Sequence, residues 1–168
     1  MNNDILTFRK TMGQFATGVT VVTTIRDGVP YGLTVNSLTS VSLDPLQILV
    51  CISRSSVTHA HIETTGLFAV SILSERQHMV STIFAGAPMS DRFQEVEVRP
   101  APSGCPVIEG SIAWLDARVI QSIDSGDHTI FIASVSDMGI IDGDVPPLLY
   151  HRGRYARVSA DHSPIGSA

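Results

Sequence analysis

The order of apolar and polar residues predicts a chain built mainly of β-strands. Apolar side chains recur at alternate positions, and Thr and Val are frequent between them, as in half-buried strands. Asp27-Gly28 separates two such runs and favours a tight hairpin turn. Strands are expected at 17–25, 31–39, 46–53, 67–73, 112–123, 129–140, 148–151 and 155–158. The run 46–53 is nearly continuous in apolar residues, which predicts burial on both faces.

Helical patterns are few and short. Residues 4–15 carry Leu6, Phe8, Met12 and Phe15 on one face of a predicted amphipathic helix. A second helix is expected to run to about Glu63 with Ser55 or Ser56 as its N-cap, and a third at 75–84. The Pro- and Gly-rich stretch 85–110 is expected to be an irregular loop, and 159–168 a frayed tail. This balance predicts an antiparallel barrel or sandwich.

The composition supports one domain, expected to span 1–158 of the 168 residues. A hydrophobic share of 43% supplies a full core, whereas only 16% of residues are charged. So apolar a chain with so few charges suggests that a second copy covers part of its surface, so we expect a homo-oligomer. The 19 Ser and 13 Thr agree with a β-rich fold.

The net charge and the cysteines limit which ligands and which cellular compartment are expected for this protein. The net charge of -5 argues against nucleic acid as a ligand. No signal peptide or membrane span is predicted from the sequence. Cys51 and Cys105 form no metal or disulfide pattern, which favours structural thiols in a reducing cytoplasm.

Several common catalytic motifs are missing. The stretch 13–20 has the glycine spacing of a phosphate loop but Val19 in place of its lysine, and no Rossmann G-x-G-x-x-G or hydrolase G-x-S-x-G is present. His59 and His61 are two apart on a predicted helix and therefore face different sides, so solvated histidines are expected and no metal site.

Two polar clusters follow predicted strands. Thr34, Asn36 and Ser37 replace the apolar residues expected near the end of one strand. These residues are compatible with an ordinary edge strand, or with a binding site in which they hydrogen-bond to the polar edge of a planar heterocycle. Ser53-Arg54-Ser55-Ser56 lies where a strand meets a helix, and such a junction can hold a phosphate through hydroxyls, backbone N–H groups and a guanidinium.

Two more clusters lie in loops and turns. Phe84-Ala85 and Asp91-Arg92-Phe93 flank the long loop, where they fit core anchoring with a surface ion pair or ligand contacts. The turn residue His128 and the arginine-rich stretch 151–155 are unusual in a chain so poor in charge, and together they suggest a second anionic ligand.

The chain as a whole resembles the short-chain flavin reductases, the reductase components of two-component flavin-dependent monooxygenases. The resemblance covers about 6–157. It is carried by the ordered motifs Gly13-Gln14-Phe15-Ala16-Thr17-Gly18, Ser40-Val41-Ser42-Leu43-Asp44-Pro45, Phe84-Ala85-Gly86, Arg92-Phe93, Gly104-Cys105-Pro106, Gly126-Asp127-His128-Thr129 and Pro147-Leu148-Leu149-Tyr150.

The resemblance implies a split β-barrel, a homodimer with the flavin near the subunit interface, and NAD(P)H:flavin oxidoreductase activity. Flavin contacts are implied for Thr34, Val35, Asn36, Ser37, Ser40, Ile52, Ser53, Arg54, Ser55, Ser56, Val57, Thr58, Phe84, Ala85 and Arg92. NAD(P)H contacts are implied for His128, Arg152, Gly153, Arg154 and Tyr155. Hydride is expected to pass directly between the cofactors, with His128 holding the dinucleotide.

Three alternatives remain open at this point. The chain could carry or sense flavin without turnover, serve as an interaction barrel without flavin, or act as a one-component oxidase. Within the reductase hypothesis, FMN and FAD are both compatible with 53–58, and NADH is expected over NADPH. A separate oxygenase component is expected to receive the reduced flavin by diffusion.

Overall fold

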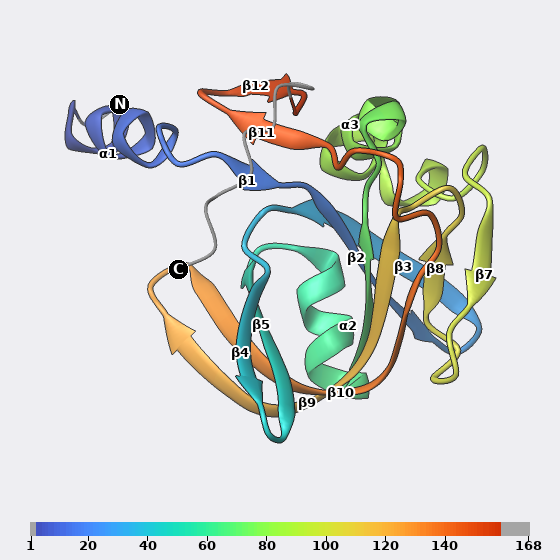
Figure 1. Cartoon of the computed structure of the whole chain (residues 1–168). Coiled ribbons are helices and arrows are strands. Elements are labelled where there is room, and N and C mark those ends of the chain that lie inside the picture. Colours follow the sequence, from blue (N-terminus) through green and yellow to red (C-terminus); the bar gives the residue numbers. More distant parts are fainter. Residues whose placement is uncertain (1–2, 159–168) are drawn as a thin grey trace.

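The computed structural model describes residues 3–158, which fold mainly into antiparallel β-sheet with a few short helices (Figure 1). This confirms the predicted fold class. The helices are α1 (Asn3–Met12), α2 (Val57–Thr65) and α3 (His78–Gly86), with the short 3-10 turns η1 (Glu75–Gln77) and η2 (Met89–Asp91). The strands are β1 (Thr17–Gly18), β2 (Thr20–Arg26), β3 (Val29–Val35), β4 (Thr39–Leu43), β5 (Leu46–Ser53), β6 (Leu67–Ile72), β7 (Val98–Pro100), β8 (Pro106–Ile108), β9 (Ala113–Ser125), β10 (His128–Ile140), β11 (Leu149–His151) and β12 (Arg154–Ala156).

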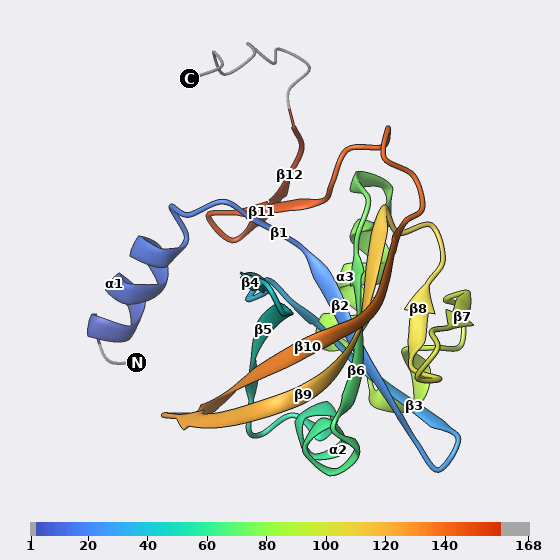
Figure 2. The ribbon, with the colours of Figure 1, turned by 60° about the horizontal axis from the view of Figure 1, so that its bottom comes forward.

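Seven strands form the main sheet in the order β3-β2-β6-β9-β10-β5-β4, and every neighbouring pair is antiparallel. The sheet curls strongly, as Figures 1 and 2 show from two directions. Its edge strands β3 and β4 are not hydrogen-bonded to each other in the described chain, so the curl is open along one side. The antiparallel, curled architecture agrees with the predicted barrel.

Turn chemistry accounts for the hairpin of β2 and β3. Asp27 and Gly28 both have positive φ, 52° and 77°, which a two-residue hairpin turn requires. The strands then pair from Thr20 opposite Val35 to Arg26 opposite Val29. The Asp-Gly turn therefore sets the register that brings the polar end of β3 beside the start of β2.

One core fills the concave side of the sheet, and α2 contributes Ile62 to it. Phe68, Phe131 and Val50 lie in the same cluster and are fully buried. A second core packs α3 against the sheet through Phe84, which is also fully buried. These two cores fix the positions of the helices that flank the candidate site.

A small sheet, β1-β11-β12, lies between α1 and α3 in both ribbon views (Figures 1 and 2). Helix α1 extends away from the rest of the chain, and none of its residues is buried. Its apolar face is therefore uncovered, with Phe8 67% and Met12 53% exposed. The predicted N-terminal helix is present, but it ends at Met12, so Phe15 lies outside it, and Leu6 does not share the side that carries Phe8 and Met12. This chain alone supplies no core for the helix.

Four expectations about local structure need correction. Strand 46–53 is present as β5, but its burial alternates, because only the side bearing Ile48, Val50 and Ile52 faces the core. The stretch 85–110 is not wholly irregular, since β7 and β8 form a hairpin within it. The helix expected at 75–84 is divided into η1 and α3. The expected tail 159–168 lies outside the described residues, and the domain boundary at 158 stays a prediction.

The two histidines of α2 are the fourth correction, because neither is a solvated surface group. His59 is 5% exposed and lies 2.8 Å from the Thr129 hydroxyl. His61 stacks on Tyr31 with ring centroids 3.6 Å apart. The helix packs against β2 and β3, so residues two apart can both meet the sheet. Residues 3–158 contain no cluster of three or more potential metal-ligating side chains.

Candidate functional site

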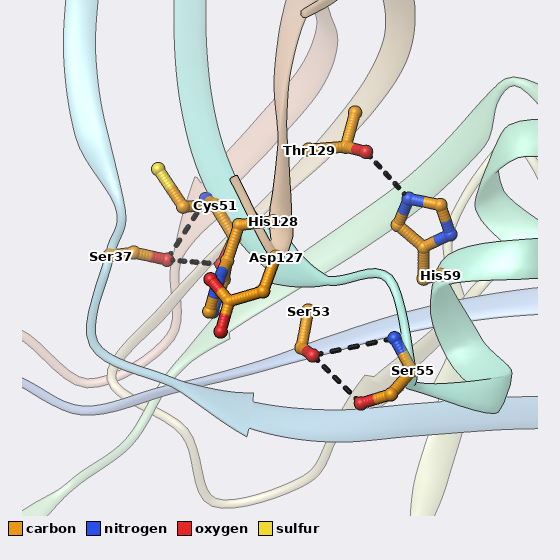
Figure 3. A network of polar contacts seen from close by, with 8 residues as sticks. All are labelled: Ser37, Cys51, Ser53, Ser55, His59, Asp127, His128 and Thr129. Carbon is orange, nitrogen blue, oxygen red and sulfur yellow. Dashed lines mark hydrogen bonds and ion pairs between the residues drawn. The ribbon is translucent and has the colours of Figure 1, made fainter. Parts of the chain in front are cut away.

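The polar end of β3 is held in place by hydrogen bonds to other elements. The Thr34 hydroxyl donates to the Ser81 carbonyl oxygen of α3 at 2.7 Å. Ser37 bridges to β5, since its hydroxyl donates to the Cys51 carbonyl at 2.9 Å and accepts from the Cys51 N–H at 3.0 Å (Figure 3). Through these two bonds the Ser37 side chain pairs with the backbone of β5 where a strand residue would otherwise do so. The Ser37 hydroxyl hydrogen is already donated within the protein, so this side chain has fewer hydrogen-bonding groups available to a ligand.

Two cavities meet at this end of β3. The smaller, about 200 Å³, is lined by Val19, Thr34, Val35, Asn36, Ser81, Ala85, Tyr150 and Tyr155. The larger, about 1080 Å³, extends from Asn36 and Ser37 to Arg152 and Gly153, under the exposed α1. Both share Asn36 and Tyr150. The fold thus brings residues predicted for flavin and residues predicted for the dinucleotide to one hollow.

The β11–β12 hairpin is tied to the rest of the site at both ends. The Tyr155 hydroxyl donates to Ser81 Oγ at 2.9 Å, and the Tyr155 ring lies 5.8 Å from that of Tyr150. Arg152 has a positive φ of 51° in the hairpin turn, and its Nε donates to Gln14 Oε1 at 2.8 Å. Arg154 is exposed at the start of β12. These contacts place Tyr155 at the smaller cavity and Arg152 at the larger one, whereas Arg154 lines neither.

Sequence reasoning assigned no role to three residues that line the smaller cavity: Val19, Ser81 and Tyr150. Ser81 precedes Ala85 by four positions on α3, so helical spacing places both on one face and could have identified it. Tyr150 belongs to the Pro147–Tyr150 motif, which carried the family resemblance without a role for this ring. No sequence signal distinguishes Val19 from other apolar strand residues.

The junction between β5 and α2, residues 53–58, is here called the phosphate segment. Ser53 Oγ lies 2.9 Å from Ser55 Oγ (Figure 3). Ser56 occupies the N-cap position of α2 without a side-chain bond to the helix. Thr58 Oγ1 is buried and has no hydrogen-bond partner in residues 3–158. An orphaned hydroxyl in the first turn of a helix, where the helix dipole is positive, fits an anion such as a flavin phosphate.

His128 lies at this segment and not at the β11–β12 hairpin. It is paired directly with Ser53 across the β10–β5 ladder. Its Nδ1 is 2.7 Å from Asp127 Oδ1, and this hydrogen bond lowers the pKa of the Asp127 carboxyl (Figure 3). No contact within residues 3–158 joins His128 to Arg152 or Tyr155. The two halves of the predicted dinucleotide site are therefore apart in one chain.

The other residues predicted to contact flavin differ in how exposed they are. Ile52 is 1% exposed and Phe84 is fully buried, so both side chains belong to the core. Ser40 lies on edge strand β4 and is exposed, as is Val57 at the start of α2. Ala85, next to Phe84, does line the smaller cavity. These positions differ in how much side-chain surface they offer a ligand.

Arg92 binds the backbone around the site. Its Nη1 donates to the Gly32 carbonyl at 2.6 Å and its Nε to the Ala87 carbonyl at 3.0 Å. Burial lowers the pKa of the Arg92 guanidinium. The surface ion pair considered with Asp91 does not form in the described chain, because Asp91 accepts from Ser90 and Gln94 instead. Arg92 thus holds the loop after α3 against β3.

The described part of the chain contains no helix long and apolar enough to cross a membrane. Cys51 and Cys105 are both free thiols, as expected, and burial raises the pKa of each. The polar side chains described at the site are hydroxyls, arginines, a histidine and tyrosines.

Comparison with known proteins gives one consistent family. The family model described as flavin reductase like domain matches residues 12–159. The reductase subunit HsaB of a flavin-dependent monooxygenase from Mycobacterium tuberculosis is 38% identical over 159 residues, covering 94% of this chain and 84% of that protein. A flavin reductase (NADH) from Kitasatospora aureofaciens is 42% identical over 165 residues, covering 96% and 86%.

Solved structures agree with this assignment. The NADH:FAD oxidoreductase SgcE6 of Streptomyces globisporus, in complex with NAD and FAD fragments, superposes with a TM-score of 0.90 at 35% identity. The match covers 95% of this chain and 96% of that one. A sequence match over nearly the whole chain and a shared fold point to the same group of proteins, so this chain belongs to the flavin reductase like domain family.

Proposed function

We propose that this protein is an NAD(P)H:flavin oxidoreductase that supplies reduced flavin to a separate monooxygenase component. The observation that carries the proposal is the meeting of two cavities at Asn36 and Tyr150. One is lined by the polar end of β3, and the other extends to Arg152. Two large planar ligands that exchange a hydride need such adjacent sites. One relative named flavin reductase (NADH) and one named as the reductase subunit of a flavin-dependent monooxygenase support the same function.

The residues of the chain are proposed to align and hold the reactants. A bound flavin supplies a ring that accepts hydride from the nicotinamide. Thr34, Val35 and Asn36 face the smaller cavity, where backbone and amide groups can meet the polar edge of that ring. Tyr150 and Tyr155 also line this cavity and add aromatic surface to it. Hydride transfer needs no general acid, so positioning is the chain's main contribution.

The phosphate segment is proposed to bind the flavin phosphate or pyrophosphate. Arg54, the serine hydroxyls and the first N–H groups of α2 converge there. The orphaned Thr58 hydroxyl supports an anion at this point. Either FMN or FAD suits this donor set, and a relative bound to FAD fragments supports FAD as one of them.

NADH is proposed as the preferred reductant over NADPH. The decisive assay follows NADH oxidation by the purified protein with FMN, with FAD or with no added flavin, beside an NADPH control. We expect oxidation only when flavin is present and faster with NADH. Flavin binding without NADH oxidation would instead identify a carrier or sensor, and turnover of an organic substrate without NADH would identify an oxidase.

A homodimer is proposed, with the flavin near the subunit interface. The support is the uncovered apolar side of α1, where Ile5 is 48%, Phe8 67% and Met12 53% exposed, above the larger cavity. Burial of such a face on a second copy removes apolar surface from water. It also allows the partner to bring its own groups to a site whose dinucleotide residues are apart in one chain.

Charge introduced on this face tests the dimer. We expect Phe8→Asp to convert the protein to a monomer in light-scattering chromatography, because an unpaired carboxylate in an apolar interface is costly. The matched control is Thr7→Asp, which introduces the same carboxylate off the side that carries Ile5, Phe8 and Met12 and should leave the mass unchanged. A wild-type monomer, or a dimer retained by Phe8→Asp, would contradict the proposed interface.

A separate oxygenase is proposed to receive the reduced flavin by free diffusion, with the cytoplasm as compartment. The low charge of the chain supports this route, because no strongly basic patch suggests electrostatic docking. The two free thiols agree with a reducing compartment. In stopped-flow experiments, a competing flavin-binding protein should intercept the transfer to the oxygenase. Transfer unaffected by that trap would instead indicate direct handover.

A further inference from the structure

A chain of polar contacts leads from the interior of the protein to Arg54. His59 of α2, 5% exposed, has its Nε2 2.8 Å from Thr129 Oγ1 (Figure 3). Thr129 is fully buried on β10, and its hydroxyl donates to Asp124 Oδ1 at 2.9 Å. Asp124 Oδ2 lies 3.6 Å from Arg54 Nη1. Three elements thus converge on one exposed guanidinium.

The Asp124 carboxylate determines which group donates and which accepts in each of these hydrogen bonds. Asp124 can only accept, so the Thr129 hydroxyl hydrogen is used on Asp124. Thr129 Oγ1 then has only lone pairs to offer His59, so His59 must carry its hydrogen on Nε2. The direction of donation therefore runs from the buried imidazole outward to the carboxylate.

The buried contacts from His59 through Thr129 to Asp124 matter because the Asp124–Arg54 pair at their outer end is exposed. The side chains of Arg54 and Asp124 are 52% and 63% exposed, and an isolated ion pair of this kind orients its partners weakly. Anchoring Asp124 from the interior reduces the freedom that the pair must lose. The Arg54 N–H also donates to the Asp127 carbonyl at 3.0 Å, so backbone and side chain of Arg54 both bind the β9–β10 hairpin.

We propose that His59, Thr129 and Asp124 are positioning residues that hold the Arg54 guanidinium toward the flavin phosphate. The inference rests on the proposed function, because it needs a phosphate at the phosphate segment. A guanidinium has five N–H donors, so contact of Nη1 with Asp124 leaves others for phosphate oxygens. The His59–Thr129–Asp124 contacts thus affect how tightly the protein binds the phosphate of the cofactor, and not how tightly it binds the flavin ring.

Flavin binding with and without a phosphate tests this proposal. Dissociation constants for FMN and riboflavin are measured by flavin fluorescence quenching on the purified protein. We expect Asp124→Ala and Thr129→Val each to raise the FMN constant about fivefold, a typical coupling for contacting residues, with riboflavin unchanged. Asp137→Ala removes an exposed carboxylate from the same hairpin, outside this chain of contacts, and should change neither constant.

Arg54→Ala separates the possible outcomes. In that background, Asp124→Ala should have no further effect on FMN, because both act through one guanidinium. Equal losses for FMN and riboflavin, additive effects, or tighter FMN binding by Asp124→Ala would overturn the positioning role. If Arg54→Ala itself spares FMN, the phosphate segment is wrongly assigned. If the wild type binds neither flavin, the proposed function fails. Asp124 is exposed, so its variant tests the idea even if Thr129→Val does not fold.

Discussion

Phe84→Ala is expected to lower the free energy of unfolding by about 3–5 kcal/mol, because it removes a large ring from a packed core. The ring is fully buried and meets Phe93 edge to face at 4.9 Å between centroids. A Cβ added to Gly32 would lie 2.8 Å from the ring. The backbone of β3 therefore packs directly on Phe84, and the cavity left by alanine cannot readily collapse.

Urea denaturation of the variant measures this loss. Met79→Ala on the same helix is the matched control, since Met79 is 58% exposed and its loss should cost within about 0.5 kcal/mol. The folded fraction of Phe84→Ala should keep its flavin affinity near the wild-type value. A small stability loss with a large loss of flavin affinity would return Phe84 to the ligand-contact role implied by sequence resemblance.

His128→Ala is expected to raise the KM for NADH about tenfold, while the dissociation constant for flavin changes much less. The side chain is 44% exposed, and its Nδ1 contact with Asp127 fixes the ring orientation. Nε2 is then available for a ligand, and a hydrogen bond to a charged group is worth about 1.5–3 kcal/mol. Loss of that contact corresponds to tenfold or more in binding.

Steady-state kinetics and flavin titration of the same preparation measure both constants. Asp127→Asn is the matched control: its amide oxygen can still accept from His128 Nδ1, so the KM for NADH should stay near wild type. His128 is paired with Ser53 of the phosphate segment, so the opposite pattern has a clear meaning. Weaker flavin binding with an unchanged KM would move His128 from the dinucleotide to the flavin phosphate.

The role of Arg92 could not be read from its neighbours in sequence. An arginine after an aspartate in a polar loop suggests an ion pair or a ligand contact. In the folded chain its donors face the Gly32 and Ala87 carbonyls, because β3 passes beside that loop. Such pairings depend on segments 60 residues apart, which local patterns do not describe.

Local chemistry was sufficient wherever neighbouring residues decide the conformation. The Asp27-Gly28 turn and the bounds of β5 follow from residue types and spacing alone, whereas the N-cap of α2 is narrowed only to Ser55 or Ser56, and the structure has Ser56 there. The same holds for the ordered motifs that predicted the flavin reductase family, which the family match over 12–159 confirms. Sequence by itself therefore determined the fold class, most elements and the kind of cofactor to expect.

Only the tertiary structure decided which of these residues share a surface. It joined Thr34 to Ser81 and Tyr155 at one cavity, buried His59 against Thr129 and left the apolar face of α1 uncovered. It also separated His128 from the β11–β12 hairpin in one chain. The physical reason is that sheet register and helix packing set contacts between distant residues, whereas patterning along the chain reports only the local preference of each segment.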